Sequence, residues 1–351
     1  MLLNKLTLDG YRVKAKVKDD QVHAPAGGVT VKGKEFRGGE FIPSEGGYAA
    51  EYKKSLQKKE PENKKEPKHK RIDTSTLGIA KKNDDGKWVT ESGEPLPEHL
   101  SGVHIPPGYT NVFYNKNPES NVLACGVDAA GRKQVIYAKS HHDRKKAIKF
   151  SRVRELDKQF KNIMNEIANE KERKEEALIM KMIAMTGVRP GSEEDTKAQV
   201  QAYGATTLQK QHVAVEDGKV YLKFIGKKGV QNNILIPDQN IGKLIWNRAN
   251  KLKNNEDTLF KTDYNRLLDY SKSLDGGKFT TKDFRTLHAT KTAMKKVAEI
   301  ESPTDEKDYK KKVSEVAKHT ASILGNTATV CLQSYIDPLV FAEWKLKAGV
   351  N

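Results

Sequence analysis

The stretch HVAVEDGKVYLKFIGKKGVQNNILIP, residues 212–237, decides the fold class of this 351-residue chain. Apolar and polar residues alternate along it between two turns that contain glycine, Asp217-Gly218 and Gly226–Gly229. This pattern predicts a three-stranded antiparallel meander. The segments on both sides have a helical pattern, and a small sheet among helices indicates the α+β class.

Helical periodicity begins at about residue 149. Apolar residues recur at spacings of three and four from Val153 to Ile167, which is typical of an amphipathic helix. A second apolar helix, EEALIMKMIAMTG, ends at Gly187, and residues 239–345 are again helical in pattern. We therefore predict a mainly α-helical domain over residues 148–351 that contains the meander, with Trp246 and Trp344 as core anchors.

The first part of the chain has no such periodicity. Short apolar runs separated by Pro and Gly, as in IPPGYTNVFYN and NVLACGVDAAGRKQVIYAK, predict a small β-rich domain over residues 73–147. We interpret His141, His142 and Asp143 as part of an exposed basic linker rather than a metal site.

Residues 1–72 form an extension of unknown role. Residues 23–43 have the pattern of short strands and turns, whereas residues 52–71 hold nine basic and three acidic residues and almost nothing apolar. Such a segment cannot offset its ordering entropy by burial, so we interpret it as a flexible linker.

The net charge of the chain indicates what kind of molecule it binds. The chain has 63 Lys and Arg residues against 46 acidic ones, a net charge of +17, and such a field attracts polyanions such as nucleic acid. Its two cysteines, Cys125 and Cys331, offer neither a disulfide framework nor a zinc spacing. We found no apolar run of the roughly 20 residues that a membrane span needs and no glycine-rich nucleotide loop. We expect an intracellular protein that binds nucleic acid, without a nucleotide or a membrane.

Four short stretches in the second half carry polar side chains at predicted element ends: TGVRPGSEED, FIGKKGV, TTKDFRTLHAT and GNTATVCLQSYIDP. They supply Arg189, Lys227, Lys228, Lys282, Arg285, Asn326 and Tyr335. Each stretch alone has a plain structural interpretation, such as a basic residue at a helix end or a lysine in a turn.

Together these residues satisfy the demands of phosphodiester transesterification without a metal. A tyrosine nucleophile needs the phosphate charge neutralised, and arginine forks do this best. A neutral amide can complete the cradle, and a lysine can protonate the leaving oxygen. Each such contribution typically lowers the barrier by roughly 3 to 5 kcal/mol.

The order of Arg189, Lys227, Arg285, Asn326 and Tyr335 resembles that of the type IB DNA topoisomerases, specifically their small bacterial and poxvirus-like branch. The resemblance covers about residues 100–345 and includes HIPPGYTNVFYN, GVDAAGRKQVIYAK, KDFRT and LGNTATVCLQSYIDP. It implies an enzyme that nicks one strand through a 3′-phosphotyrosyl intermediate, lets the duplex swivel, and religates, without ATP, metal or any other cofactor.

The resemblance also implies the role of each residue. Tyr335 would be the nucleophile, Arg189 and Arg285 would bind the scissile phosphate, and Lys227 would be the general acid, with Lys228 the nearby alternative. Asn326 stands where other branches have histidine; it can donate a hydrogen bond to a phosphate oxygen but carries no charge.

In the β-rich domain, GRKQVIY resembles the strand that the family lays in the major groove. The implied DNA contacts are Arg132, Lys133, Gln134 and Tyr137, together with Lys228 and Lys282 of the catalytic domain. Val135 stands where poxviral members have tyrosine, which leaves site preference open. The expected partner is double-stranded DNA, clamped by a monomer, in the cytoplasm of a bacterium (associated with the nucleoid) or in the host-cell compartment of a virus or phage.

Two alternatives stay open. A tyrosine recombinase or integrase shares this catalytic logic, but such enzymes favour histidine where this chain has Lys282 and begin with a helical clamping domain. A DNA-binding protein without catalysis, with Tyr335 as a core aromatic, would leave the other polar positions unexplained.

Overall fold

The computed structural model describes residues 76–197 and 201–350, together with the backbone of five short strands before residue 76. These early strands are β1 (Asn4–Leu8), β2 (Tyr11–Lys14), β3 (Gly28–Val31), β4 (Lys34–Arg37) and β5 (Glu40–Pro43). β1 pairs with β2, and β3, β4 and β5 form an antiparallel sheet, so the predicted strands within residues 23–43 are confirmed. The predicted linker at residues 52–71 lies outside the described residues.

The described chain divides into two compact units, one of which is Glu60–Lys149. We call it the cap unit. Its five-stranded antiparallel sheet has the order β10-β9-β8-β6-β7. The strands are β6 (Leu77–Lys82), β7 (Trp88–Thr90), β8 (Thr110–Asn115), β9 (Val122–Val127) and β10 (Lys133–Tyr137). Alternate residues of these strands, such as Val112 and Tyr114, enter a small core together with Leu100 and Ile105.

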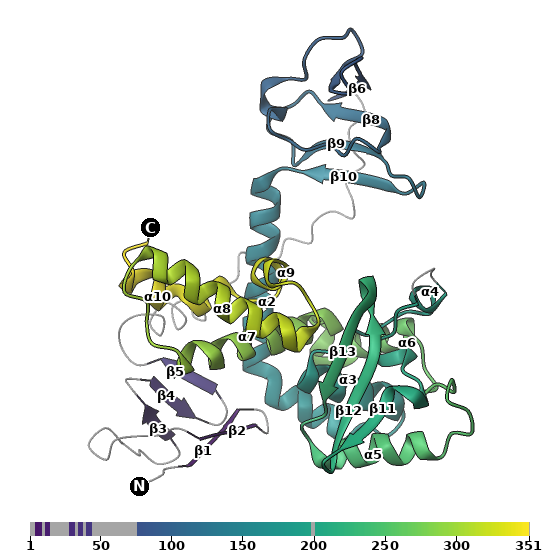
Figure 1. Cartoon of the computed structure of the whole chain (residues 1–351), viewed down its shortest axis with the longest axis vertical. Coiled ribbons are helices and arrows are strands. Elements are labelled where there is room, and N and C mark those ends of the chain that lie inside the picture. Colours follow the sequence, from purple (N-terminus) through teal and green to yellow (C-terminus); the bar gives the residue numbers. More distant parts are fainter. Residues whose placement is uncertain are drawn as a thin grey trace. The chain divides into compact units, whose positions relative to one another are not determined.

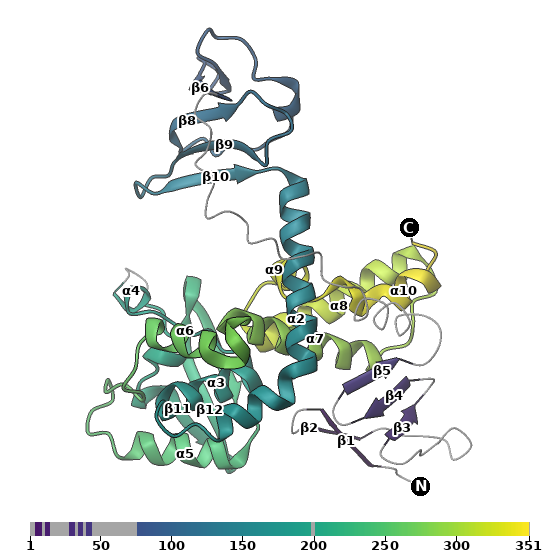
Figure 2. The ribbon, with the colours of Figure 1, turned by 180° about the vertical axis from the view of Figure 1, so that it is seen from behind.

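The other unit comprises Phe150–Asn351 and residues 1–59; its described residues from Phe150 onward are here called the catalytic unit. Its meander consists of β11 (Val213–Glu216), β12 (Lys219–Gly226) and β13 (Val230–Leu235), in that order, as predicted. Helix α5 packs along β11 and β12, as Figures 1 and 2 both show. The helices are α2 (Lys139–Ala168, which starts in the cap unit), α3 (Lys174–Thr186), α4 (Glu193–Thr196), α5 (Gln239–Asn250), α6 (Tyr264–Ser273), α7 (Thr281–Glu299), α8 (Glu306–Leu324), α9 (Ala328–Ser334) and α10 (Ala342–Lys347).

Helix α7 joins the two hydrophobic cores of the catalytic unit. Phe284 and Leu287 in its first half pack into the core formed with α3, α6 and the meander. Ala289 and Ala293 in its second half pack into the core formed with α8 and the C-terminal helices. Because one rigid helix belongs to both cores, both halves of the unit hold that helix in place.

Two expectations from the sequence are wrong. His141, His142 and Asp143 lie in a helix rather than a linker, because α2 begins at Lys139, although His142 and Asp143 are exposed as predicted. His141 in its first turn is buried, and its ring stacks on Tyr137 at a centroid distance of 4.5 Å. The many charged residues in this segment leave no clear apolar periodicity, so the helix start could not be recognised from the sequence. Trp344 is buried as predicted, but Trp246 on α5 is 36% exposed.

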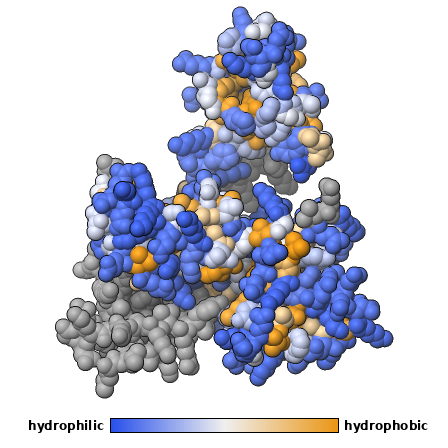
Figure 3. All heavy atoms as spheres, viewed as in Figure 1, coloured by the Kyte–Doolittle hydropathy of each residue, from blue (hydrophilic) through white to orange (hydrophobic). Residues whose placement is uncertain are grey.

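The surface is mainly polar. Hydrophilic residues cover most of the face seen in Figure 3, with only scattered hydrophobic ones. None of the helices in the described part of the chain is long and apolar enough to cross a lipid bilayer.

Candidate active site

A cleft of about 890 Å³ in the catalytic unit brings together most of the predicted catalytic residues. The predicted residues along its wall are Arg189, Lys227, Lys282, Arg285 and Tyr335. They come from the loop after α3, the β12–β13 turn, the start of α7 and the end of α9. Segments that are far apart in the sequence therefore present cations and a phenol to one space.

Arg285 lies at the back of this cleft. It is 3% exposed, and its Nη1 and Nη2 donate to the carbonyls of Gly187 and Leu324, the latter at 2.8 Å. Its buried Nε has no hydrogen-bond partner among the residues that the structure describes. Burial, and then the positive charge of Arg189, lower the pKa of Arg285 to about 10, so it stays protonated at neutral pH.

Arg189 and Asn326 form a pair beside it. Helices α3 and α8 end at the left-handed glycines Gly187 (φ 67°) and Gly325 (φ 61°), and these turns set the paths that lead to the two residues. Arg189 Nη2 donates to Asn326 Oδ1, and Nη1 lies 3.5 Å from the carbonyl oxygen of Gly325. The Asn326 NH₂ group lies 4.0 Å from the Cys331 sulfur, a weak acceptor, and is the end of the side chain that can donate to an anion.

Tyr335 directly follows α9. Its backbone N donates to the Cys331 carbonyl at 2.9 Å, and its own carbonyl accepts from Thr290 Oγ1 at 3.1 Å. Cys331 is fully buried, and burial raises the pKa of its thiol, which agrees with the predicted packing role. The backbone of Tyr335 is thus fixed from both sides while its ring reaches the cleft.

The β12–β13 turn separates the two candidate general acids. Lys227 and Lys228 are both exposed at the turn, as predicted. Lys227 lines the cleft, whereas Lys228 is in the left-handed conformation (φ 65°) and is not among the described residues that line it. This placement favours Lys227 for a role inside the cleft.

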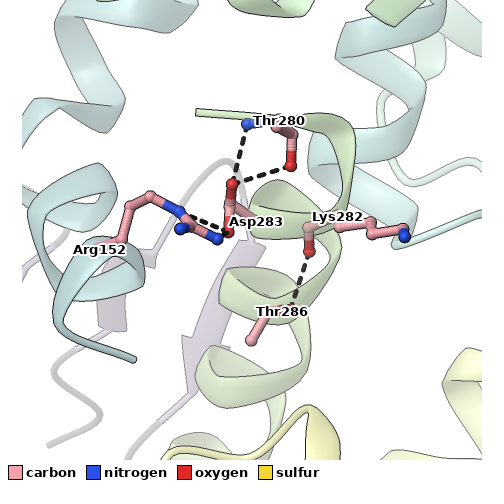
Figure 4. A network of polar contacts seen from close by, with 5 residues as sticks. All are labelled: Arg152, Thr280, Lys282, Asp283 and Thr286. Atoms are coloured by element: carbon pink, nitrogen blue, oxygen red, sulfur yellow. Dashed lines mark hydrogen bonds and ion pairs between the residues drawn. The ribbon is translucent and has the colours of Figure 1, made fainter. Parts of the chain in front are cut away.

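An ion pair between a buried carboxylate and a half-exposed arginine, which we did not predict, supports the start of α7 (Figure 4). Asp283 is 1% exposed and accepts hydrogen bonds from the backbone N and Oγ1 of Thr280, both at 2.9 Å. It also pairs with Arg152 of α2, whose Nη2 lies 2.8 Å away. Lys282 points away from this network, so the neighbouring acid anchors the helix while Lys282 faces the cleft.

The turn after Tyr335 has a similar support. Arg154 of α2 donates to Asp337 at 2.6 Å, and both side chains are largely buried. Asp337 in turn accepts from the backbone N of Leu339. Helix α2 therefore fixes the positions of Arg285 and Tyr335 through two separate ion pairs.

Acidic residues also face the cleft, and sequence analysis did not single them out. Glu193, Glu194 and Asp195 of α4 and Asp263 lie along its wall. The SEED sequence at residues 192–195, shortly after Arg189, carries three of them and was the available sequence signal. Among the described residues, no group of three or more His, Cys, Asp or Glu side chains is arranged to hold a metal ion.

In the cap unit, Asp128 organises two of the predicted DNA contacts. Arg132 donates to it from Nε and Nη2, at 2.9 and 2.8 Å, and Gln134 Nε2 donates at 2.9 Å. These hydrogen bonds, those of Arg132 foremost, hold the pKa of Asp128 at about 2. Lys133 is exposed on the same strand, and Tyr137 carries the stacked His141 ring.

The described site thus holds a buried guanidinium over a tyrosine ring, a second arginine paired with an amide, and a lysine on a turn beside the cleft. Comparison with known proteins identifies the family. The family model described as "Eukaryotic DNA topoisomerase I, catalytic core" matches residues 137–337, more than half of the chain. That range contains all of the predicted catalytic residues.

Curated viral enzymes are similar over longer spans. DNA topoisomerase 1B of Acanthamoeba polyphaga mimivirus is 27% identical over 259 residues, which cover 68% of this chain and 77% of the viral protein. DNA topoisomerase I of monkeypox virus and DNA topoisomerase 1B of vaccinia virus (strain Copenhagen) are each 25% identical over 281 residues, 72% of this chain and 85% of theirs.

The chain therefore belongs to the type IB DNA topoisomerase family. The predicted family, enzyme class and α+β fold are confirmed. The recombinase alternative is set aside, because the family match is to topoisomerases and the cap unit is a β-sheet rather than a helical domain. The roles of the individual residues stay predictions.

Proposed function

We propose that this enzyme relaxes supercoiled duplex DNA by a transesterification in which Tyr335 is the nucleophile. The observation that carries the proposal is the cleft that gathers Tyr335 with Arg189, Lys227, Lys282 and Arg285. Four cations around one phenol suit an anionic diester whose charge must be neutralised before an oxygen nucleophile can approach.

In the cleavage step, the Tyr335 oxygen bonds to the phosphorus of a backbone diester and loses its proton to water. The bond from phosphorus to the 5′ oxygen breaks, and that oxygen takes a proton from Lys227. The strand then ends in a 3′-phosphotyrosine and a free 5′-hydroxyl. Because the phosphotyrosyl bond keeps the energy of the diester, the 5′-hydroxyl can reverse the step after the duplex has swivelled, without ATP.

The two arginines and Asn326 bind the non-bridging oxygens. Arg285 is suited to this because its buried charge is held by two backbone carbonyls, so it needs little reorganisation when the phosphate enters. Arg189 is held by Asn326 and Gly325 in the same way. Lys282, one turn before Arg285 on the cleft side of α7, supplies a further phosphate contact.

The cap unit contributes to duplex binding through Arg132, Lys133, Gln134 and Tyr137. The net charge of +17 suits a protein that surrounds a polyanion as a monomer. Neither a nucleotide nor a metal has a role in the steps proposed here.

The test is relaxation of negatively supercoiled plasmid in EDTA without ATP, with the intact protein and with Tyr335→Phe. The variant keeps the ring under Arg285 and loses only the hydroxyl. We expect relaxation and a covalent protein–DNA adduct from the first, and neither from the second, with equal DNA affinity. Relaxation by Tyr335→Phe would refute the assignment of the nucleophile.

A further inference from the structure

Asn232 connects the turn that carries Lys227 with the loop that carries Asn326. It lies on β13, paired with Phe224 of β12, and is partly buried. Its Nδ2 donates to the carbonyl of Val230 at 2.9 Å, which fixes the plane of the carboxamide. The orientation of this side chain is therefore set by its own strand.

The carboxamide occupies the space beside two glycines. A Cβ atom added at Gly226, directly before Lys227, would lie 2.5 Å from Asn232 Nδ2. One added at Gly325, directly before Asn326, would lie closer still to Asn232 Oδ1. Gly226 has φ −99° and ψ −173°, which any residue can adopt. Its backbone conformation therefore does not require glycine, and the lack of a side chain leaves room for Asn232.

Through its contact with Gly325, the hairpin packs close to Arg189 and Asn326, the pair proposed to bind the phosphate. Val230 Cγ1 lies 3.5 Å from the same Cβ position at Gly325, so the start of β13 packs on this glycine. The carbonyl of Gly325 faces Arg189 Nη1, and Asn326 accepts from Arg189 Nη2. One side of Asn232 thus contacts the segment before the general acid, and the other contacts the segment that fixes Arg189.

The hairpin needs such an anchor. Around its tip, Ile225 and Gln231 are exposed, as are Lys227, Lys228 and Gly229. The Ile225 carbonyl accepts a hydrogen bond from the Tyr203 backbone N at 2.8 Å, which holds the strand just before the tip. The exposed residues beyond it move more readily, and a lysine ammonium on a four-carbon stem follows that motion. Proton transfer requires the acid within hydrogen-bond reach of the leaving oxygen, and a displacement of about 1 Å can cost on the order of 100-fold in rate.

We propose that Asn232 is a positioning residue that docks the β12–β13 turn on the Gly325 loop and thereby places the Lys227 ammonium at the leaving 5′ oxygen. Asn232 itself touches neither the phosphate nor the nucleophile. The inference rests on the proposed role of Lys227 as the general acid. It also explains why glycine stands before Lys227, where the backbone conformation does not require it, whereas the left-handed φ of Gly325 favours glycine by itself.

The experiment compares two DNA substrates in single-turnover cleavage by the full-length enzyme. One has the ordinary 5′ oxygen at the scissile bond, and the other has sulfur in its place. When the phosphorus–sulfur bond breaks, the thiolate leaves with its electron pair and needs no proton, because thiols are far more acidic than alcohols. The sulfur substrate therefore removes the need for a general acid and leaves every other requirement unchanged.

Asn232→Ala is expected to slow cleavage of the oxygen substrate by roughly 10- to 100-fold and to cleave the sulfur substrate at the wild-type rate. Asn233→Ala is the matched control, since Asn233 is the next residue on β13 and its side chain is exposed. It should cleave both substrates like the wild type. Equal DNA affinity and melting temperature of the two variants would show that both fold and bind.

Gly226→Ala disturbs the contact between Gly226 and Asn232 by changing the glycine instead of the asparagine. Its methyl group must push the Asn232 carboxamide away, so we expect the same defect, rescued by sulfur. In the double variant with Asn232→Ala the methyl group has room, and the defect should not exceed that of Asn232→Ala alone.

The outcomes separate the inference from the proposed function. If Lys227→Ala is slow on oxygen and normal on sulfur but Asn232→Ala is slow on both, Asn232 acts on something other than the general acid and the inference is wrong. A wild-type rate of Asn232→Ala on oxygen would overturn it as well. If Lys227→Ala shows no sulfur rescue, the general-acid assignment itself fails.

Discussion

The guanidinium carbon of Arg285 lies 5.1 Å from the centroid of the Tyr335 ring. The proposed nucleophile and a proposed phosphate-binding cation are therefore in direct contact before any DNA is bound. Arg285 is also tied to Gly187 and Leu324, the residues at the ends of α3 and α8. One side chain thus links the nucleophile with both helix ends that lead to Arg189 and Asn326.

Arg285→Lys tests whether the shape of the guanidinium matters in addition to its charge. Lysine keeps the charge but cannot bond both carbonyls and also present a planar fork to the phosphate. We expect the rate of DNA cleavage to fall by on the order of 100- to 1,000-fold, as for the loss of one preorganised donor. Single-turnover cleavage measures this. A rate within the error of the wild type would show that charge alone suffices.

Lys227 and Lys228 make a natural pair of variants, since they are adjacent, exposed and alike in charge. Lys227→Ala is expected to lower the cleavage rate by roughly 100-fold or more, the usual contribution of a general acid, whereas Lys228→Ala weakens only DNA binding. Rates at saturating enzyme separate the two effects. The reverse ranking would transfer the role of general acid to Lys228.

Much of this fold can be predicted from local sequence patterns. Alternation and glycine turns predict β11, β12 and β13, and Gly187 predicts the end of α3. Except for Lys228, the cations predicted in the second half of the chain do meet Tyr335 in one cleft, because they stand at the ends of rigid elements whose lengths are encoded locally.

What could not be predicted depends on contacts between distant segments. Asp283 follows Lys282 in a motif that draws attention to its cations, yet the acid is buried and its partner, Arg152, lies far away in the sequence. The stacking of His141 on Tyr137 is a local contact, but it depends on the path of the chain from β10 into α2, which no periodic pattern describes. Periodicity shows which face of a helix or strand is apolar. It does not identify the residues from other parts of the chain that pack against that face.

Arg152→Ala tests the support of α7. The variant leaves the buried Asp283 carboxylate with its Thr280 hydrogen bonds but without a cation. We expect the free energy of unfolding to fall by about 1–3 kcal/mol, the cost of an incompletely satisfied buried group. Chemical denaturation measures it. Lys158→Ala is the control, because Lys158 also lies on α2 and its acidic partner, Glu155, is far more exposed than Asp283. Equal losses in both variants would contradict a special role for Arg152.

Asp128→Asn tests the cap unit. The change removes the negative charge that engages Arg132 and Gln134, so both side chains become available to DNA. We expect tighter non-specific binding and a plot of log affinity against log salt that is steeper by about one counterion. Asp84→Asn removes the same charge from the exposed β6–β7 turn of the same unit. The same response from both variants would mean that net charge, not the release of Arg132, is responsible.

His288 makes the fold sensitive to acid. It lies on α7 beside Gly187, and burial, and then the charge of Arg285, lower its pKa to about 4 from 6.5. The unfolded chain therefore binds a proton at a higher pH than the folded one. Stability is complete above pH 6.5 and falls as the pH drops toward 4, by on the order of 3 kcal/mol over that range.

His288→Gln removes this titration, so the free energy of unfolding should depend less steeply on pH below 6.5 than in the wild type. The dependence does not vanish, because burial also lowers the pKa of His212 to about 4. His319→Gln on the exposed side of α8 is the control for the exchange of a histidine for glutamine outside the core. Urea denaturation at a series of pH values measures the slopes. An unchanged slope for His288→Gln would show that His288 is protonated to the same extent in the folded and unfolded chains.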